Sequence, residues 1–390
     1  MNKKRIIIGE ILLLIAVIIG TYFFVTRLKE KPTTETTATS SEIQKETTTS
    51  TTVEEKDPLE VIIDDMTLEE KVGQLFFVRV PEENQVQDIK DYHLGGYVLF
   101  ARDTDDVTKD ELIKRIADYQ AASKIPLLIG SDEEGGSVTR VSHNLELSYY
   151  VFGSPQEIYA SGGWQGIVDD TKDKAAILSE LGINTGLFPV ADVATDPDAF
   201  IYDRTIGKDA KGTSEFVEKV VETLKEVQSG STLKHFPGYG DNRDSHVEIV
   251  RDDRPLDELR ENDFLPFIAG IKAGADSILV SHNIVNSIDA TVPASISPAI
   301  HEILRDELNF EGVVMTDDMD MAGLADFISQ DEAGLAALQA GNDLVMSSSY
   351  QTQIPYVIAA IENGEYTEEQ LDTSVRRVLQ WKQNLGLLEE

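Results

Sequence analysis

The sequence contains no cysteine among its 390 residues. Disulfide bonds, thiolate zinc sites, a cysteine nucleophile and a lipid-modified cysteine anchor are therefore excluded. Basic residues are also scarce, since 34 Lys and Arg stand against 70 Asp and Glu and give a formal net charge of −36. This charge repels phosphate backbones and anionic lipid, so we expect no binding of nucleic acid and no docking of the folded part on a membrane surface.

One long apolar run is present, and it lies near the N-terminus. It spans residues 6–25, directly after three basic residues, and its length matches the roughly 20 residues that cross a bilayer. No small-residue cleavage site follows, which predicts a transmembrane signal-anchor over 1–31, with a cleaved signal peptide as the alternative. Residues 32–56 are Thr-rich and predict a flexible linker. The remainder is then expected to face the outside of the cell membrane, or to be secreted if the signal is cleaved.

Residues 57–390 contain short apolar runs that alternate with helical patterns, for example over 110–122 and 214–228. Near-continuous apolar runs indicate strands that are buried on both faces. The eight candidate strands are 75–80, 96–100, 126–130, 185–190, 231–236, 277–280, 312–315 and 343–346. This order predicts an α/β fold of the (β/α)8 TIM-barrel type in one catalytic domain, with an open doubly wound sheet as the alternative.

Polar side chains follow several of these strands. They include Asp132, Asp192, Lys234, His235 and Asp317. In a barrel the carboxyl ends of the strands converge on one mouth, where such enzymes place their chemistry. The positions of these side chains therefore favour the barrel and predict a site at its mouth.

Residues 234–246 read Lys-His-Phe-Pro-Gly-Tyr-Gly-Asp-Asn-Arg-Asp-Ser-His, a strand end followed by a loop rich in Gly and Pro. The loop carries Asp244 and His246, two residues apart. A carboxylate beside an imidazole fixes its tautomer and raises its pKa, which makes a general acid near neutral pH. The same residue types also allow a metal site of His235, Asp241 and His246, or a solvated surface loop.

Residues 313–319, Val-Val-Met-Thr-Asp-Asp-Met, lead from a buried strand directly into two carboxylates. Neighbouring side chains on a strand point to opposite faces, so only one of Asp317 and Asp318 is expected to face the mouth, and Asp318 is expected to cap a helix. Retaining glycosidases place one carboxylate beneath the anomeric carbon and use a separate proton donor. Residues 128–136 form a third strand that ends in acids and a Gly-Gly turn, which suits either a sugar-hydroxyl clamp or an ordinary turn.

These segments, in this order, resemble glycoside hydrolase family 3 over about residues 66–387, and specifically its β-N-acetylglucosaminidase branch. The Lys-His-Phe-Pro-Gly stretch followed by Asp-Ser-His is specific to that branch. The resemblance implies a (β/α)8 domain without metal or cofactor, a covalent glycosyl-enzyme on Asp317, and His246 as acid/base assisted by Asp244. It also implies that five residues hold the terminal sugar: Asp132, Arg140, Arg204, Lys234 and His235.

Three positions depart from the family pattern. Glu133 and Ser137 stand where Gln and Arg are usual, and Tyr239 stands where His is usual. All three lie beside the expected nucleophile and proton donor rather than on them. We therefore expect activity to survive, with substrate preference and loop packing open.

The function that the resemblance implies is retaining hydrolysis of terminal non-reducing β-N-acetylglucosamine. The predicted anchor favours cell-wall fragments derived from peptidoglycan as the substrate, and a monomer is the default assembly. A histidine donor such as His246 becomes neutral after it gives up its proton, so the site can admit an anionic acceptor. Phosphorolysis is therefore one alternative, and a non-catalytic cell-wall-binding protein is another.

Overall fold

The computed structural model describes residues 57–389, except for 241, 243–248, 322–323 and 325–326. The predicted anchor (1–31) and linker (32–56) lie outside the described residues. Within the described part, every helix is too short or too polar to cross a bilayer.

The strands form two parallel sheets that together make a ring. The first, here called the five-stranded arc, has the order β12 (Val345–Ser347), β1 (Phe76–Arg79), β2 (Gly96–Leu99), β3 (Leu128–Ser131) and β6 (Thr185–Gly186). The second, the three-stranded arc, has the order β11 (Val313–Thr316), β9 (Ser277–Val280) and β7 (Thr232–Phe236). Isolated parallel bridges join the two arcs on both sides: Thr185 with Gly230, Val190 with Lys234, and Met315 with Leu344.

Each of the eight predicted strand intervals contains or overlaps one of these strands. The ring shows an α/β fold that is consistent with a TIM-like domain, and the open doubly wound sheet is wrong, because the bridges leave neither end of the five-stranded arc as a free edge. The inside of the ring is filled by side chains such as Phe77, which is fully buried. Gly96 and Gly130 on the neighbouring strands leave room for it, since a Cβ at either position would meet its ring at 2.8 and 2.5 Å.

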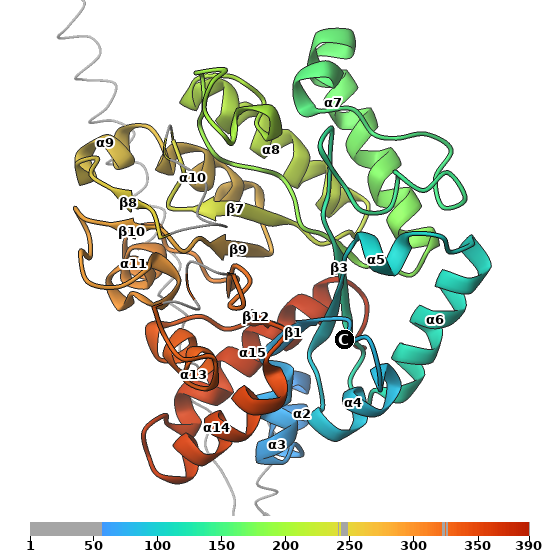
Figure 1. The fold of residues 1–390 in the computed structure, drawn as a ribbon, viewed down its shortest axis with the longest axis vertical. Helices are drawn as coiled ribbons and strands as arrows, with labels where there is room; N and C mark the ends of the chain where they lie inside the picture. The colour runs from blue at the N-terminus through green and yellow to red at the C-terminus, as the bar shows by residue number, and fades with distance from the viewer. Residues whose placement is uncertain (1–56, 241, 243–248, 322–323, 325–326, 390) are drawn as a thin grey trace, which may run out of the picture. The chain divides into compact units, whose positions relative to one another are not determined.

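Helices follow the strands and surround the ring (Figure 1). Those between the strands are α4 (Gln85–Tyr92), α5 (Ala101–Thr104), α6 (Lys109–Ala122), α7 (Pro155–Glu180), α8 (Ala210–Glu226), α9 (Leu256–Glu261), α10 (Phe264–Ala273), α11 (Pro298–Glu302) and α13 (Gln330–Ala340). The predicted helices over 110–122 and 214–228 are confirmed as α6 and α8. Thr108 and Glu111 form a capping box that fixes the start of α6, with the Thr108 hydroxyl accepting from the Glu111 amide.

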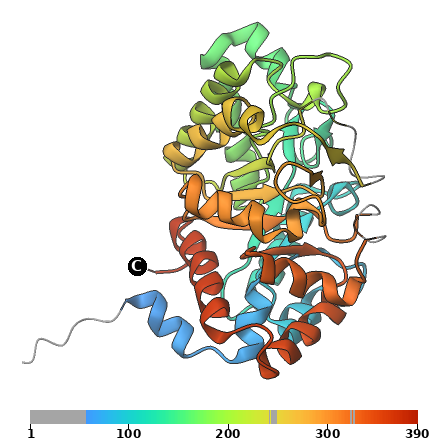
Figure 2. The same ribbon diagram turned by 90° about the vertical axis from the view of Figure 1, so that its left-hand side faces the viewer.

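The remaining helices lie at the two ends of the described chain. They are α2 (Pro58–Asp64) and α3 (Leu68–Gln74) before β1, and α14 (Tyr350–Glu362) and α15 (Glu368–Asn384) after β12. Because α3 ends just before β1 begins, it lies at the amino ends of the strands, and α15 packs against both α2 and α3 (Figure 2). The carboxyl ends of the strands are thus left for the loops that carry the site.

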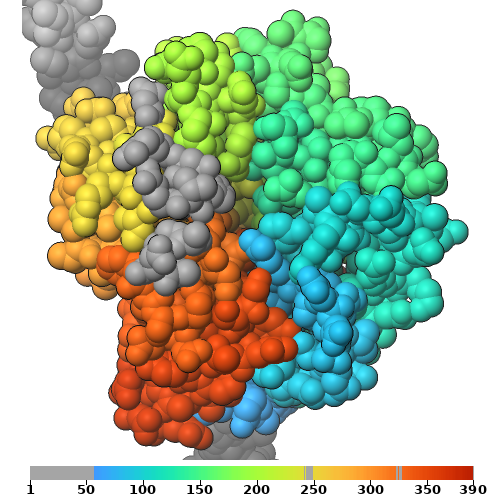
Figure 3. Space-filling view, in the orientation of Figure 1, coloured from blue at the N-terminus to red at the C-terminus, as the bar shows by residue number. Residues whose placement is uncertain are grey.

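Short elements complete these loops. They are the β4–β5 hairpin (Glu133–Gly135 and Val138–Thr139), the β8–β10 pair (Arg251–Asp252 and Ile284–Val285), and the 3-10 turns η1 (Tyr202–Arg204) and η2 (Ala294–Ile296). The π-helical turn η3 (Ile303–Glu307) directly continues α11 before β11 begins. In the space-filling view, blue-green segments from the first half of the chain meet orange segments from the second half along the middle of this face (Figure 3).

Candidate active site

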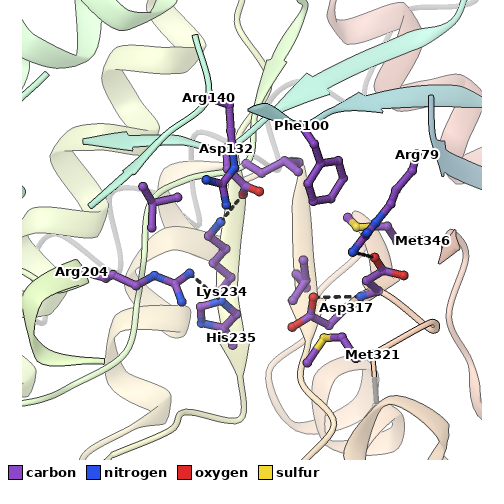
Figure 4. A pocket seen from close by; sticks show the side chains of 14 residues that line it. Arg79, Phe100, Asp132, Arg140, Arg204, Lys234, His235, Asp317, Met321 and Met346 are labelled. Atoms are coloured by element: carbon purple, nitrogen blue, oxygen red, sulfur yellow. Dashed lines mark hydrogen bonds and ion pairs between the residues drawn. The ribbon is translucent and has the colours of Figure 1, made fainter. Parts of the chain in front are cut away.

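A pocket lies where the carboxyl ends of the two arcs face each other (Figure 4). Its lining residues are Arg79, Phe100, Asp132, Val138, Arg140, Leu187, Arg204, Lys234, His235, Leu279, Asp317, Asp318, Met321 and Met346. Six residues predicted for the site are therefore brought together here: Asp132, Arg140, Arg204, Lys234, His235 and Asp317. The predicted acid/base pair, Asp244 and His246, lies outside the described residues, as does Asp241 of the alternative metal site.

A buried network of charges forms one side of the pocket. Lys234 in the middle of β7 places its Nζ 2.6 Å from Asp132 Oδ1 and 2.6 Å from Glu134 Oε1. Arg204 in η1 donates from Nε and Nη2 to the two carboxylate oxygens of Glu134, at 2.9 and 2.8 Å. Such a bidentate pair fixes the plane of the guanidinium as well as its position. The network therefore holds two cations and Asp132 in place before any ligand arrives.

The charges in this network keep one another ionised. Burial opposes ionisation of Glu134, but Arg204 and Lys234 more than offset it and hold the pKa of Glu134 well below its usual value. Burial likewise opposes the charge of Lys234, but Asp132 and Glu134 raise the pKa of its ammonium above the usual range. The pocket thus presents fixed charges near neutral pH, which suits hydrogen bonding to sugar hydroxyls.

His235 is held in one tautomer. Its Nδ1 lies 2.8 Å from Asp192 Oδ2, and its Nε2 lies 3.2 Å from Arg204 Nη2. A guanidinium can only donate, so Nε2 must accept and Nδ1 must carry the proton that Asp192 accepts. Burial lowers the pKa of His235 despite the neighbouring Asp192 carboxylate, so the ring is neutral. Asp192 also accepts from the Tyr239 amide at 2.7 Å, which ties the next loop to the site.

The prediction that only one of the two adjacent carboxylates faces the mouth is wrong, since both Asp317 and Asp318 line the pocket. Strand β11 ends at Thr316, so the alternation of strand faces does not extend to them. The Asp318 amide donates to Asp317 Oδ1 at 2.8 Å. Asp318 does accept from the Asp320 amide at 3.0 Å, as a cap does, but its other oxygen is ion-paired with Arg79.

Asp318 is expected to make the folded state less stable as pH rises from about 4 to about 6. Burial raises the pKa of Asp318 to about 6, against the opposing charge of Arg79. The folded state then binds a proton that the unfolded state has lost, so the free energy of unfolding falls across this window by up to about 3 kcal/mol. Asp318→Asn should reduce that slope when urea unfolding is compared at pH 4.5 and pH 7. Equal slopes in the wild-type and variant proteins would contradict the assignment.

Two of the departures from the family pattern have structural roles. The Glu133 carboxylate is buried and accepts from the amides of Arg140 and Val141, at 3.0 and 2.7 Å, and from Ser142. It thereby fixes the backbone that carries Arg140. The Tyr239 ring is buried and packs edge-on against His235, with their centroids 5.1 Å apart. Ser137, the third departure, is exposed in the turn between β4 and β5.

Sequence reasoning missed part of this site. It assigned no role to Glu134, Arg79, Phe100, Met321 or Met346. A signal was present for Arg79 and Phe100, because they stand at and just after the ends of β1 and β2, as Asp132 stands after β3. No sequence pattern marks the two methionines.

Comparison with known proteins gives the same assignment of family. The model of the glycosyl hydrolase family 3 N-terminal domain matches residues 67–381. Beta-hexosaminidase A of Pseudoalteromonas piscicida is 30% identical over 328 residues, which are 76% of this chain and 54% of that protein. Beta-hexosaminidase LpqI of Mycobacterium tuberculosis is 31% identical over 326 residues, which are 80% of this chain and 82% of the relative.

A solved structure with the same architecture is a glycoside hydrolase family 3 β-N-acetylglucosaminidase from Paenibacillus. It has 28% sequence identity and a TM-score of 0.77, with 83% of this chain and 63% of that chain covered. The chain thus spans little more than half of the Pseudoalteromonas relative and less than two thirds of the Paenibacillus structure. The family model covers most of the described residues, including every residue that lines the pocket. The chain therefore belongs to glycosyl hydrolase family 3.

Proposed function

We propose that this protein hydrolyses terminal, non-reducing β-N-acetylglucosamine with retention of configuration. The observation that carries the proposal is the pocket itself, in which Asp317 shares one cavity with Asp132, Arg140, Lys234 and His235. The names of the relatives support the choice of sugar, since they include β-hexosaminidases and a β-N-acetylglucosaminidase.

Asp317 is the proposed nucleophile. Its carboxylate attacks the anomeric carbon while the glycosidic bond breaks, and the departing oxygen takes a proton from His246, which is assisted by Asp244. Water then attacks the anomeric carbon of the glycosyl-enzyme, His246 takes a proton from that water, and Asp317 leaves as the carboxylate. The hydrogen bond from the Asp318 amide orients Asp317 for the attack. The roles of Asp244 and His246 rest on the sequence resemblance.

The sugar hydroxyls are the proposed ligands of the charged side of the pocket. Asp132 and Lys234 offer an acceptor and a donor side by side, 2.6 Å apart. Among the described residues, the Arg140 guanidinium has no ion-pair or hydrogen-bond partner, so its donors are available to sugar oxygens. Arg204 is held in position by Glu134, and His235 is held in position by Asp192.

The cell envelope is the proposed setting. The N-terminal apolar run and the Thr-rich segment favour a membrane anchor with the catalytic domain on the outer side, or secretion if the anchor is a cleaved signal. Fragments of peptidoglycan are then the accessible source of β-linked N-acetylglucosamine. We propose that the protein acts on them as a monomer.

Trapping of the glycosyl-enzyme tests the proposal directly. A 5-fluoro N-acetylglucosaminyl donor slows the second step more than the first, so the covalent intermediate should accumulate. Peptide mass spectrometry should then find one sugar mass on the peptide that contains Asp317. A label on any other residue, or time-dependent inactivation without a label, counts against the mechanism.

Product analysis separates hydrolysis from phosphorolysis. The reaction should yield free N-acetylglucosamine whether or not phosphate is present. Sugar 1-phosphate as the main product in phosphate buffer would make the protein a phosphorylase of the same fold. A protein that cleaves no chromogenic N-acetylglucosaminide in either buffer would favour a wall-binding role instead.

A further inference from the structure

A second buried ion pair lies outside the pocket, in α7. Lys174 Nζ lies 2.7 Å from Asp170 Oδ2, one helical turn earlier, and the two side chains are only 5% and 11% exposed. Helix α7 contacts β4 and β6 and lies beside α8 (Figure 1). Both members of the pair stand outside the set of described residues that line the pocket. The cost of desolvating two charges largely offsets their attraction, so the pair by itself contributes little to stability.

Lys174 has a further polar partner, and this partner belongs to the charged network of the site. Its Nζ donates to the main-chain carbonyl oxygen of Glu134 at 2.8 Å. Glu134 is thus held by its main chain as well as by its carboxylate, which pairs with Arg204 and Lys234. One small cavity is lined by Glu134, Lys174 and Arg204 together, so the ammonium of Lys174 lies directly behind the network.

The position of the Lys174 ammonium is itself well defined. Its Nζ lies 5.4 Å from the centroid of the Phe152 ring and 5.7 Å from that of Phe188, within the range in which an aromatic face attracts a cation. A Cβ at Gly135 would lie 3.2 Å from Nζ, so the ammonium packs directly against the chain that follows Glu134. The two rings and the ion pair therefore fix the donor to which the Glu134 carbonyl is bound.

Glu134 passes its position on to the residues of the pocket. Its two carboxylate oxygens accept both hydrogen bonds from Arg204, and a bidentate pair tolerates little displacement. The β4–β5 hairpin, which contains Glu134, also leads directly to Arg140 in the pocket lining. A shift of the Glu134 main chain would therefore displace the cations on which the proposed sugar contacts depend.

We propose that Lys174 is a positioning residue for the terminal sugar, which it affects through its hydrogen bond to the Glu134 main chain. This role rests on the proposed function, because it requires that Arg204 and Lys234 bind the sugar. Lys174 itself does not contact the sugar. Its removal should weaken binding of the sugar in the ground state and the transition state alike, and such a loss raises KM while kcat stays nearly unchanged.

Asp170→Asn/Lys174→Met tests the hydrogen bond without leaving an unpaired carboxylate in the interior. The KM for 4-nitrophenyl N-acetyl-β-glucosaminide and the Ki of free N-acetylglucosamine should both rise roughly 10-fold, while kcat stays within about threefold. Asp170→Asn alone keeps the donor, so its KM and Ki should remain within about threefold of wild type. Lys172→Met is the matched control and should change neither constant, since Lys172 lies on the same helix and pairs with Glu226 at the surface.

A merely structural role would give a different result. Partial unfolding lowers the amount of active protein and hence the apparent kcat, but it leaves KM and Ki unchanged. That result, or an equal rise in KM for Asp170→Asn alone, would overturn the role of Lys174. If the double variant does not fold, Asp170→Leu/Lys174→Met replaces the pair by apolar side chains, which often preserves stability, and the same rise in KM is expected.

Failure of this role and failure of the proposed function are distinguishable. A wild-type protein that neither cleaves N-acetylglucosaminides nor binds free N-acetylglucosamine would contradict the proposed function itself. A wild-type protein that does both, with KM and Ki unchanged in the double variant, would contradict only the role of Lys174.

Discussion

Asp317→Asn should lower kcat by roughly 10⁴-fold or more, a loss of about 5.4 kcal/mol in transition-state stabilisation. The amide keeps the shape of the side chain but is a poor nucleophile, so the glycosyl-enzyme cannot form. Substrate binding should persist, because the charged side of the pocket is untouched. Single-turnover and steady-state kinetics with a chromogenic N-acetylglucosaminide measure both quantities.

A chemical rescue makes this expectation specific to a nucleophile. In Asp317→Ala, azide should take the place of the carboxylate and yield the α-glycosyl azide from a substrate with a good leaving group. Asp257→Asn is a control, since this exposed carboxylate on α9 lies away from the pocket and its variant should retain full activity. Retention of more than a tenth of the activity in Asp317→Asn, or a β-configured azide product, would remove Asp317 from the role.

Glu134→Gln should have the largest effect on stability, lowering the free energy of unfolding by about 3–5 kcal/mol. Its carboxylate is only 1% exposed and neutralises two buried cations, Arg204 and Lys234. The amide leaves those cations facing each other without their shared anion. Urea unfolding at pH 7 provides the measurement. Glu180→Gln, which breaks the partly exposed pair with Lys109, is the comparison and should cost less than about 1 kcal/mol.

The loss of unfolding free energy in Glu134→Gln is expected to depend on pH in one direction only. The pKa of Glu134 is lower in the folded state than in the unfolded chain, so its contribution is complete above the unfolded value of about 4.3 and is lost as pH falls further. The difference between wild type and Glu134→Gln should therefore be constant from pH 5 to pH 8 and shrink only in stronger acid. A difference that already shrinks between pH 8 and pH 6 would show that Glu134 is not the ion-pair partner described.

The order of strands could be predicted from the sequence because each strand is buried on both faces. Residues 76–78 of β1, for example, are all buried and all apolar, and such runs stand out between amphipathic helices. The closure of the ring could not be read in the same way. It depends on isolated bridges such as Val190–Lys234 and Met315–Leu344, which have no sequence pattern of their own.

Part of the candidate site can be predicted from where its residues stand relative to the predicted strands. Asp132 and Asp317 directly follow β3 and β11, where a barrel brings side chains together, and Lys234 lies within β7. Arg140 and Arg204 lie on loops, and only the family resemblance pointed to them.

Glu134 escaped prediction for a different reason, because its role arises from pairing with Arg204, a residue far away in sequence. The position of Arg79 at the end of β1 is a signal in the sequence, but its pairing with Asp318 has no sequence pattern. The alternation of strand faces does not apply to Asp317 and Asp318, because β11 ends at Thr316 and these two acids are the first and second residues beyond it.

The ion pairs at the mouth also hold the two arcs of the barrel together. Lys234–Asp132 and Arg79–Asp318 each connect the three-stranded arc with the five-stranded arc, one near each junction. At those junctions the main chain supplies isolated bridges in place of a continuous ladder. Under the proposed function, a sugar that contacts both arcs would stabilise the ring at these junctions, so that ligand binding and closure of the ring would be thermodynamically linked.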